Sequence, residues 1–142
     1  MYVNTTAWVF LIFYDIYIKV LSVMKKQPQI YRDVSLILDF WMNRKWSDSI
    51  PKIWRYTIYS SVIGYVLEMV SASSDAYEMP EGREDNIRKI ISNLNKVMLV
   101  SRVFSENGVI SYKQINYLDE LSEKINGQAK KWLNSIKSKK DK

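Results

Sequence analysis

Lysines and arginines gather in the second half of this chain at spacings that suit phosphate neutralisation. Lys89 and Lys96 stand seven residues apart, so on a helix they share one face, and Arg102 follows nearly two turns later. Cations held on a rigid helix can neutralise nucleic-acid phosphates, whereas each cation taken singly is also ordinary solubilising charge. The candidate nucleic-acid-binding residues are Arg83, Arg88, Lys89, Lys96, Arg102, Lys113, Lys124, Lys130, Lys131 and Lys137.

Arg102 is the leading single candidate in this set. It lies inside the mostly apolar run from Val97 to Phe104, where a charged residue needs a reason. Binding an anion is one such reason. A salt bridge to Glu106, or to another subunit, is the alternative.

The residue types needed for catalysis are largely missing. The chain contains no Cys and no His, which excludes disulfides, thiolate metal sites and Ser-His-Asp arrangements. Glu120 and Glu123 are three residues apart with no third acid or His beside them, so they are a poor catalytic pair. Four glycines form no phosphate-binding loop. We therefore expect a non-enzyme without a metal or cofactor.

The net charge of +6 is unevenly distributed along the sequence. Residues 1–82 carry eight Lys/Arg and eight Asp/Glu, whereas residues 83–142 carry thirteen and seven. A basic half joined to a neutral half indicates an anionic partner, with nucleic acid ahead of acidic lipid. Lys139, Lys140 and Lys142 are expected to form a basic tail at 138–142.

The elements that must position these cations are helices. Helical spacing of apolar residues predicts helices over 31–47, 51–77, 83–105 and 111–137, separated by a loop at 77–82 and a stop at Asn107-Gly108. Ser111 and Gln114 have the form of a capping box at the start of the last helix. Trp132 falls at a core-like position there and is expected to pack, with stacking on a nucleic-acid base as the alternative. The fold class is all-α, an up-down-up-down four-helix bundle spanning 31–137.

The helix over 51–77 raises the question of oligomerisation. Its apolar residues point to nearly every side, although a helix of a monomeric bundle normally keeps one polar face. Burial both inside the bundle and against a second subunit accounts for this pattern, with Tyr59, Ile63, Val66 and Met69 as the expected oligomer interface. The alternative is a monomer in which the N-terminal extension covers the second face.

The first thirty residues stand apart as a hydrophobic extension. Thr5 to Val23 is almost continuously apolar and approaches the length of a membrane span, but Asp15 and Lys19 interrupt it. Three interpretations stay open: an extra amphipathic helix packed on the bundle, a membrane-surface segment, and upstream residues that are not translated because the natural start is Met24. Membrane association is the least favoured, and the expected location is the cytoplasm.

Several short motifs resemble one known family in order and spacing. They are Leu38-Asp39-Phe40-Trp41-Met42, Ile50-Pro51-Lys52 with Arg55-Tyr56-Thr57-Ile58, the positions Leu94, Leu99 and Arg102, the run Val109 to Gln114, and Leu118, Ile125, Trp132 and Leu133. Together they resemble the Avd-type four-helix-bundle proteins, the accessory variability determinants of diversity-generating retroelements. The resemblance covers residues 33–136. Related four-helix-bundle proteins encoded in intervening sequences of ribosomal RNA share the pattern.

The resemblance implies a homopentamer that binds a reverse transcriptase and its structured template RNA during mutagenic reverse transcription. Lys52 and Arg55 would then be the candidate polymerase contacts. The chain departs from the family at Tyr59-Ser60-Ser61-Val62, where an Arg is lost, and at Lys130-Lys131, where two cations replace small residues. The alternatives are a ribosomal intervening-sequence type of undefined role and a membrane-surface adaptor that uses the N-terminal segment.

Overall fold

The computed structural model describes residues 11–12, 14–15, 29–42, 50, 52–55 and 57–140. Within these residues it contains helices α2 (Gln29–Met42), α3 (Lys52–Arg55), α4 (Ile58–Glu78), α5 (Arg83–Glu106) and α6 (Tyr112–Lys140), and no strand. The prediction of an all-α chain is confirmed. Most of the N-terminal extension predicted at 1–30 lies outside the described residues, as do residues 43–47 of the first predicted helix.

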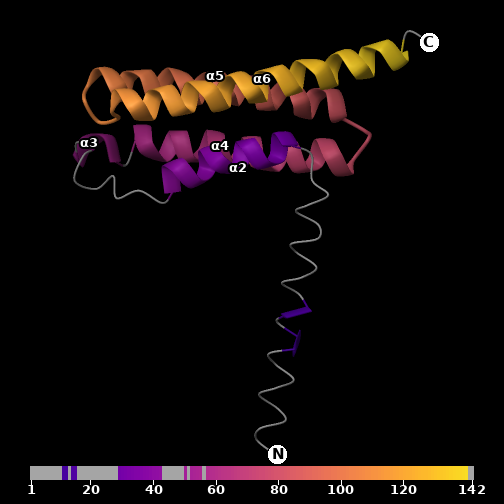
Figure 1. The fold of residues 1–142 in the computed structure, drawn as a ribbon, viewed down its shortest axis with the longest axis horizontal. Helices are drawn as coiled ribbons and strands as arrows, with labels where there is room; N and C mark the ends of the chain where they lie inside the picture. The colour runs from indigo at the N-terminus through magenta and orange to yellow at the C-terminus, as the bar shows by residue number, and fades with distance from the viewer. Residues whose placement is uncertain are drawn as a thin grey trace, which may run out of the picture.

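The four longer helices form a bundle in which each helix runs opposite to the one before it (Figure 1). Helix α2 packs against α4 and α6, and α5 packs against α4 and α6. Figure 1 shows two layers, with α2 and α4 in one and α5 and α6 in the other. The up-down-up-down bundle predicted from the short loops is therefore observed.

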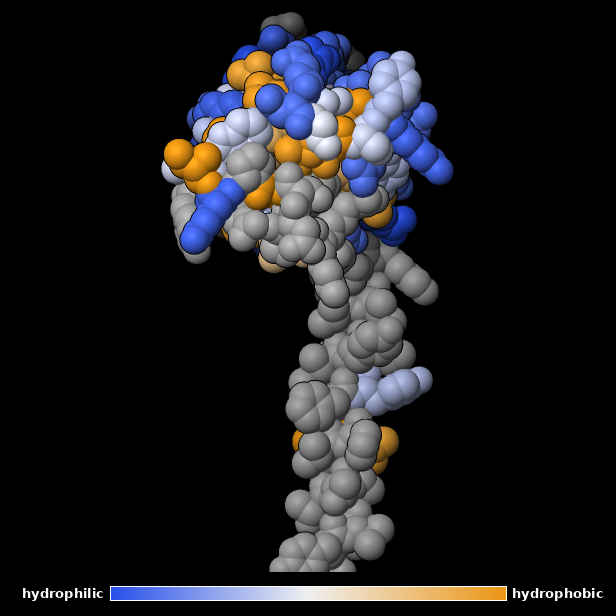
Figure 2. Space-filling view, turned by 90° about the vertical axis from the view of Figure 1, so that its left-hand side faces the viewer, coloured by the Kyte–Doolittle hydropathy of each residue, from blue (hydrophilic) through white to orange (hydrophobic). Residues whose placement is uncertain are grey.

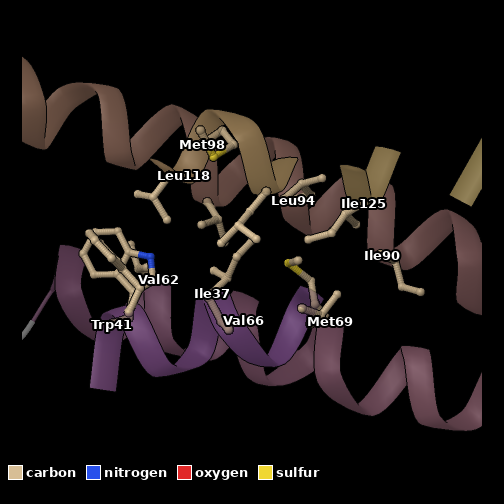
Figure 3. Close-up of a cluster of buried hydrophobic side chains, with 14 of the residues drawn as sticks. Ile37, Trp41, Val62, Val66, Met69, Ile90, Leu94, Met98, Leu118 and Ile125 are labelled. Atoms are coloured by element: carbon tan, nitrogen blue, oxygen red, sulfur yellow. The ribbon is translucent and has the colours of Figure 1, made fainter. Parts of the chain in front are cut away.

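The core lies between the two layers and is filled from all four helices. Ile37 and Trp41 of α2 point toward Leu94 of α5 and toward Leu118 and Ile125 of α6 (Figure 3). All five side chains are completely buried. Burying one such side chain contributes about 1.5–3 kcal/mol, so this core is the main source of the bundle's stability.

Local signals end α5 and begin α6 where the sequence predicted them, but α6 continues to Lys140, so residues 138–140 of the predicted basic tail are helical. Gly108 adopts φ +74°, the left-handed conformation that glycine adopts without strain, and the Val109 N–H donates to the Phe104 carbonyl at 2.9 Å. The capping box is present in both directions. The Ser111 N–H donates to Gln114 Oε1 at 2.8 Å, and the Gln114 N–H donates to Ser111 Oγ at 3.2 Å.

The helix predicted over 51–77 is two helices, which corrects the sequence-based boundary. The short α3 ends at Arg55, and α4 begins at Ile58 after Thr57. The Thr57 hydroxyl donates to the Ile53 carbonyl at 3.1 Å, so this side chain serves α3 and makes no cap for α4. The Trp54 ring of α3 stacks on Phe104 of α5 with centroids 5.8 Å apart, which anchors α3 on the end of the bundle.

Helix α4 does keep a solvent face, and this changes the expected oligomer interface. Val66 and Met69 are fully buried in the single chain, so a second copy could not touch them without opening the bundle. Tyr59 and Ile63 are half-buried. The exposed face of α4 consists mainly of small and polar residues, namely Ser60, Ser61, Gly64, Glu68 and Ser71, with one large apolar side chain, Leu67.

The end of the bundle at which α3 lies shows how polar the surface is. In that view, apolar residues appear in separate patches among hydrophilic ones (Figure 2). Ile53 and Tyr112 are among the most exposed large side chains, at 75% and 80%. No continuous apolar face is visible on the described part of this end.

Candidate nucleic-acid interface

The two layers of the bundle carry opposite charge. Helix α4 has three acids and no Lys or Arg, and α2 has two acids and one Arg. Helices α5 and α6 together have twelve Lys/Arg and six Asp/Glu. The α2–α4 layer is therefore net −4 and the α5–α6 layer net +6, with the two cations of α3 at the end of the acidic layer. An anionic polymer is attracted to the α5–α6 layer.

Arg102 lies on a groove between the two helices of this basic layer. The groove has a volume of about 370 Å³ and is lined by Asn95, Met98, Leu99 and Arg102 of α5 and by Ser122 and Asn126 of α6. Arg102 is exposed, and no ion pair joins it to Glu106 in the described part of the chain. A guanidinium beside two amides and a hydroxyl offers several donors to phosphate or sugar oxygens.

Helical periodicity extends this groove toward the far end of the layer. Arg88 is seven residues before Asn95 on α5, and Lys130 is four residues after Asn126 on α6. Because the two helices are antiparallel, both cations continue the same side. Arg88 forms an ion pair with Glu84 at 3.0 Å, which places both side chains on this side and offsets part of the Arg88 charge. We define the basic groove as Arg88, Asn95, Arg102, Ser122, Asn126 and Lys130.

Lys137 follows Lys130 by seven residues and prolongs the basic groove along α6. Two acids on the same helix, Asp119 and Glu123, lower the local positive charge near Ser122. Asp119 is half-buried and Glu123 is exposed. The groove therefore alternates cations with acids, because Glu84 also pairs with Arg88 on this side.

Lys89 and Lys96 lie on the other edge of α5, beside α4. Lys96 Nζ stands 5.3 Å from the centroid of the Tyr65 ring of α4, a cation–π contact. Six residues separate Lys96 from Arg102, which turns the helix by about 600° and places them on different sides. The structure therefore splits the predicted face: Arg102 lies with α6, and Lys89 and Lys96 lie with α4.

Arg83 differs from the other candidate nucleic-acid-binding residues because its side chain stabilises the fold. Its guanidinium donates to the Ala76 carbonyl at 2.5 Å and to the Tyr77 carbonyl at 3.2 Å, and its carbon stands 5.9 Å from the Trp132 ring centroid. These two carbonyls belong to the last turn of α4, whose acceptors have no partner within the helix. Arg83 is thus largely committed to joining α4, α5 and α6.

The remaining lysines of α6 occupy its other edge, toward α2. Tyr117 contacts Phe40 of α2 with ring centroids 6.2 Å apart, and Lys124 and Lys131 follow it at steps of seven residues. Lys113 lines an open cavity of about 620 Å³ between α2 and α6, together with Asp39 and Tyr117. All three lysines are exposed, but they lie away from the basic groove.

The expected polymerase contacts lie on α3. Lys52 is exposed, and Arg55 is the last residue of that helix. Helix α3 lies at the end of the bundle (Figure 1), and its two cations are distant in sequence from the cations of the basic groove. Among the described side chains, no contact joins Lys52 to the α5–α6 layer.

Sequence reasoning missed the neutral half of the basic groove. Asn95, Ser122 and Asn126 carry no charge, so a pattern of Lys and Arg does not point to them. A usable signal exists in the spacing, since Asn95 and Arg102 are seven residues apart and share a face. In a packed pair of helices, the polar residues that flank each apolar stripe line the groove between the two helices.

Further findings bound the chemistry of the site. No group of three or more His, Cys, Asp or Glu suited to holding a metal ion occurs among the described residues. Within the same residues, no helix is long and apolar enough to cross a membrane. No family model, curated protein or solved structure matches the chain at a significant level.

Proposed function

We propose that this chain is a non-catalytic accessory protein that binds structured RNA through its α5–α6 layer. The separation of charge between the layers carries the proposal. A net charge of +6 on one side and −4 on the other orients the molecule on a polyanion. The basic groove then supplies directed donors at the place where the field attracts phosphates.

The rigidity of the α5–α6 layer supports binding of RNA at fixed positions and not only a diffuse electrostatic attraction. Helices α5 and α6 are anchored by fully buried residues such as Ile90 and Leu118, so the groove cations are held at fixed spacing. Arg88 and Arg102 lie fourteen residues apart on α5, which separates their backbones by about 21 Å. A surface of this length suits several successive phosphates.

The partner in this proposal comes from the family resemblance. We propose that the chain acts with a reverse transcriptase of a diversity-generating retroelement, in the cytoplasm, as a homo-oligomer. Its role is to hold the template RNA and present it to the polymerase. The polymerase performs the chemistry, and this chain contributes positioning and neutralisation of phosphate charge.

Co-purification tests the proposal directly. The untagged full chain is expressed with a tagged reverse transcriptase of a diversity-generating retroelement, with and without its template RNA, and the mass of the complex is measured by light scattering. A stable complex with several copies of this chain is expected. Binding to neither the polymerase nor the RNA would contradict the proposal. A gene located inside a ribosomal RNA operon would favour the intervening-sequence type.

A further inference from the structure

A second cavity lies at the opposite end of the bundle from α3, where the α4–α5 loop meets the last turns of α6 (Figure 1). Its volume is about 570 Å³. Its lining includes Gly82, Arg83 and Asp85 near the start of α5 and Trp132, Ser135 and Lys139 on α6. We call these six residues the terminal pocket. The basic groove does not include any of them.

Trp132 gives the terminal pocket a fixed aromatic surface. The side chain is half-buried, and the Arg83 guanidinium carbon stands 5.9 Å from its ring centroid. Arg83 is itself held by the carbonyls of Ala76 and Tyr77. The Arg83 guanidinium covers part of the ring, and the part of the indole that stays exposed is the surface on which an unpaired base can stack.

Asp85 supplies an acceptor pair beside that platform. Its side chain is exposed, whereas the neighbouring Glu84 is engaged by Arg88 at 3.0 Å. A carboxylate accepts two parallel hydrogen bonds. Guanine presents two adjacent donors, N1–H and the 2-amino group, and it is the base that matches this acceptor pair.

Two donors complete the match on α6. The Ser135 hydroxyl and the Lys139 ammonium line the same cavity and can donate to the O6 acceptor of guanine and to a phosphate oxygen. Pro80, Glu84 and Ile136 also line the cavity. With the Glu84 carboxylate held by Arg88, the terminal pocket offers one partly exposed aromatic surface, the Asp85 carboxylate and two donors. That combination reads a base edge, which a purely basic groove does not do.

We propose that the terminal pocket binds an unpaired guanine of the RNA, with Trp132 stacking on the base and Asp85 accepting from its Watson–Crick edge. This inference rests on the proposed RNA binding. It adds sequence preference to a protein whose groove contacts only the backbone. An unpaired guanine in a loop or at an end of the RNA would fix the position of the whole molecule along it.

Mononucleotides test the pocket separately from the groove. The full chain is titrated with GMP, IMP and AMP while the indole N–H resonance of Trp132 is followed by NMR, assigned through Trp132→Phe. GMP is expected to shift this resonance, with IMP binding about tenfold more weakly because it lacks the 2-amino donor to a charged acceptor. Equal responses to the three nucleotides, or no response to GMP, would overturn the inference.

Variants locate the recognition. Asp85→Asn is expected to remove the preference for GMP over IMP, and Glu106→Gln, an exposed acid at the other end of α5, is the matched control that leaves it intact. If Trp132→Phe proves unstable, Asp85→Asn alone decides the outcome. A GMP preference that survives Asp85→Asn would also overturn the inference. RNA binding by the groove without any guanine preference would refute this inference and leave the proposed function standing.

Discussion

Gln128 of α6 donates a hydrogen bond from Nε2 to Oδ2 of Asp33 on α2 at 2.6 Å, across 95 residues of sequence. Asp33 is only 4% exposed, and Gln29 of its own helix donates to its other oxygen at 3.2 Å. Two amides thus satisfy a buried carboxylate. This contact fixes the register of α2 on α6.

Removing the Gln128 donor is expected to destabilise the bundle. In Gln128→Met, the carboxylate keeps only the Gln29 bond and loses a charge-assisted partner, which costs about 1.5–3 kcal/mol in the free energy of unfolding. Urea denaturation followed by circular dichroism measures this. Glu120→Gln, an exposed acid on the same helix, is the control and should stay within about 0.5 kcal/mol of the parent. Equal stability of the two variants would refute the role of the contact.

Tyr59 makes the stability of the bundle sensitive to alkaline pH. Its hydroxyl donates to the Trp41 carbonyl at 2.8 Å, and burial raises the pKa of Tyr59 above its ordinary value of 10.0. A raised pKa in the folded state means that stability is fully present below pH 10 and is lost as the pH rises through the folded-state pKa.

The melting temperatures of the parent and of Tyr59→Phe measure this effect at pH 8 and near pH 10.5. The variant should be less stable at pH 8, by about 0.5–1.5 kcal/mol for the lost hydrogen bond. Between the two pH values the parent should lose more stability than the variant. Parallel losses in both proteins would show that Tyr59 does not contribute.

Arg83 and Arg88 are predicted to behave oppositely although they lie five residues apart. Arg83→Met removes both donors to the α4 carbonyls, and we expect a loss of about 1–3 kcal/mol in the free energy of unfolding. Arg88→Met breaks an ion pair at a position 53% exposed, and such pairs contribute about 0–1 kcal/mol. Chemical denaturation of the two variants checks the difference. An equal loss would mean that Arg83 is not an anchor.

Helix α4 offers a direct comparison between its inner and outer faces. Met69→Ala removes a fully buried side chain and should cost about 2–5 kcal/mol. Leu67→Ala changes a side chain that is 51% exposed and should cost about 0.5 kcal/mol or less in the monomer. Thermal unfolding measures both values, and light scattering reports whether Leu67 also affects the oligomer mass. A large loss for Leu67→Ala would point to its burial by a second copy.

The helices of the basic layer were predictable because their ends are local signals. Gly108 and the Ser111–Gln114 pair each act within a few residues, so the sequence alone places the turn between α5 and α6. The break between α3 and α4 has no such signal. Thr57 is neither Gly nor Pro, and its bond to the Ile53 carbonyl is visible only in three dimensions.

The inner and outer faces of α4 were harder to distinguish for a physical reason. Apolar residues surround much of this helix, and periodicity cannot say which of them meet the other three helices. Several exposed positions hold small residues, as at Ser60, Gly64 and Ser71. Small side chains change the hydrophobic pattern of a helix only slightly. The expected interface therefore included Val66 and Met69, which belong to the core.

The charges of the site were predictable, but their grouping was not. Sequence spacing correctly placed Lys89 and Lys96 on one face, and Lys96 indeed lies beside Tyr65. The groove around Arg102 depends on which α6 residues lie opposite it, namely Ser122 and Asn126. That pairing is a tertiary fact about the antiparallel register of the two helices.

The measurement that tests the central claim most directly is the salt dependence of binding to the template RNA. It compares Arg102→Glu/Lys130→Glu with Lys124→Glu/Lys131→Glu, which makes the same change of charge on the α2 edge of α6. The groove pair is expected to weaken binding by about ten- to a hundredfold and to lower the slope of log K against log salt by about 1.4–1.8. The control pair should change both far less, with helical content and oligomer mass unchanged in both variants. Equal losses from the two pairs, or no loss from the groove pair, would contradict RNA binding at the α5–α6 groove.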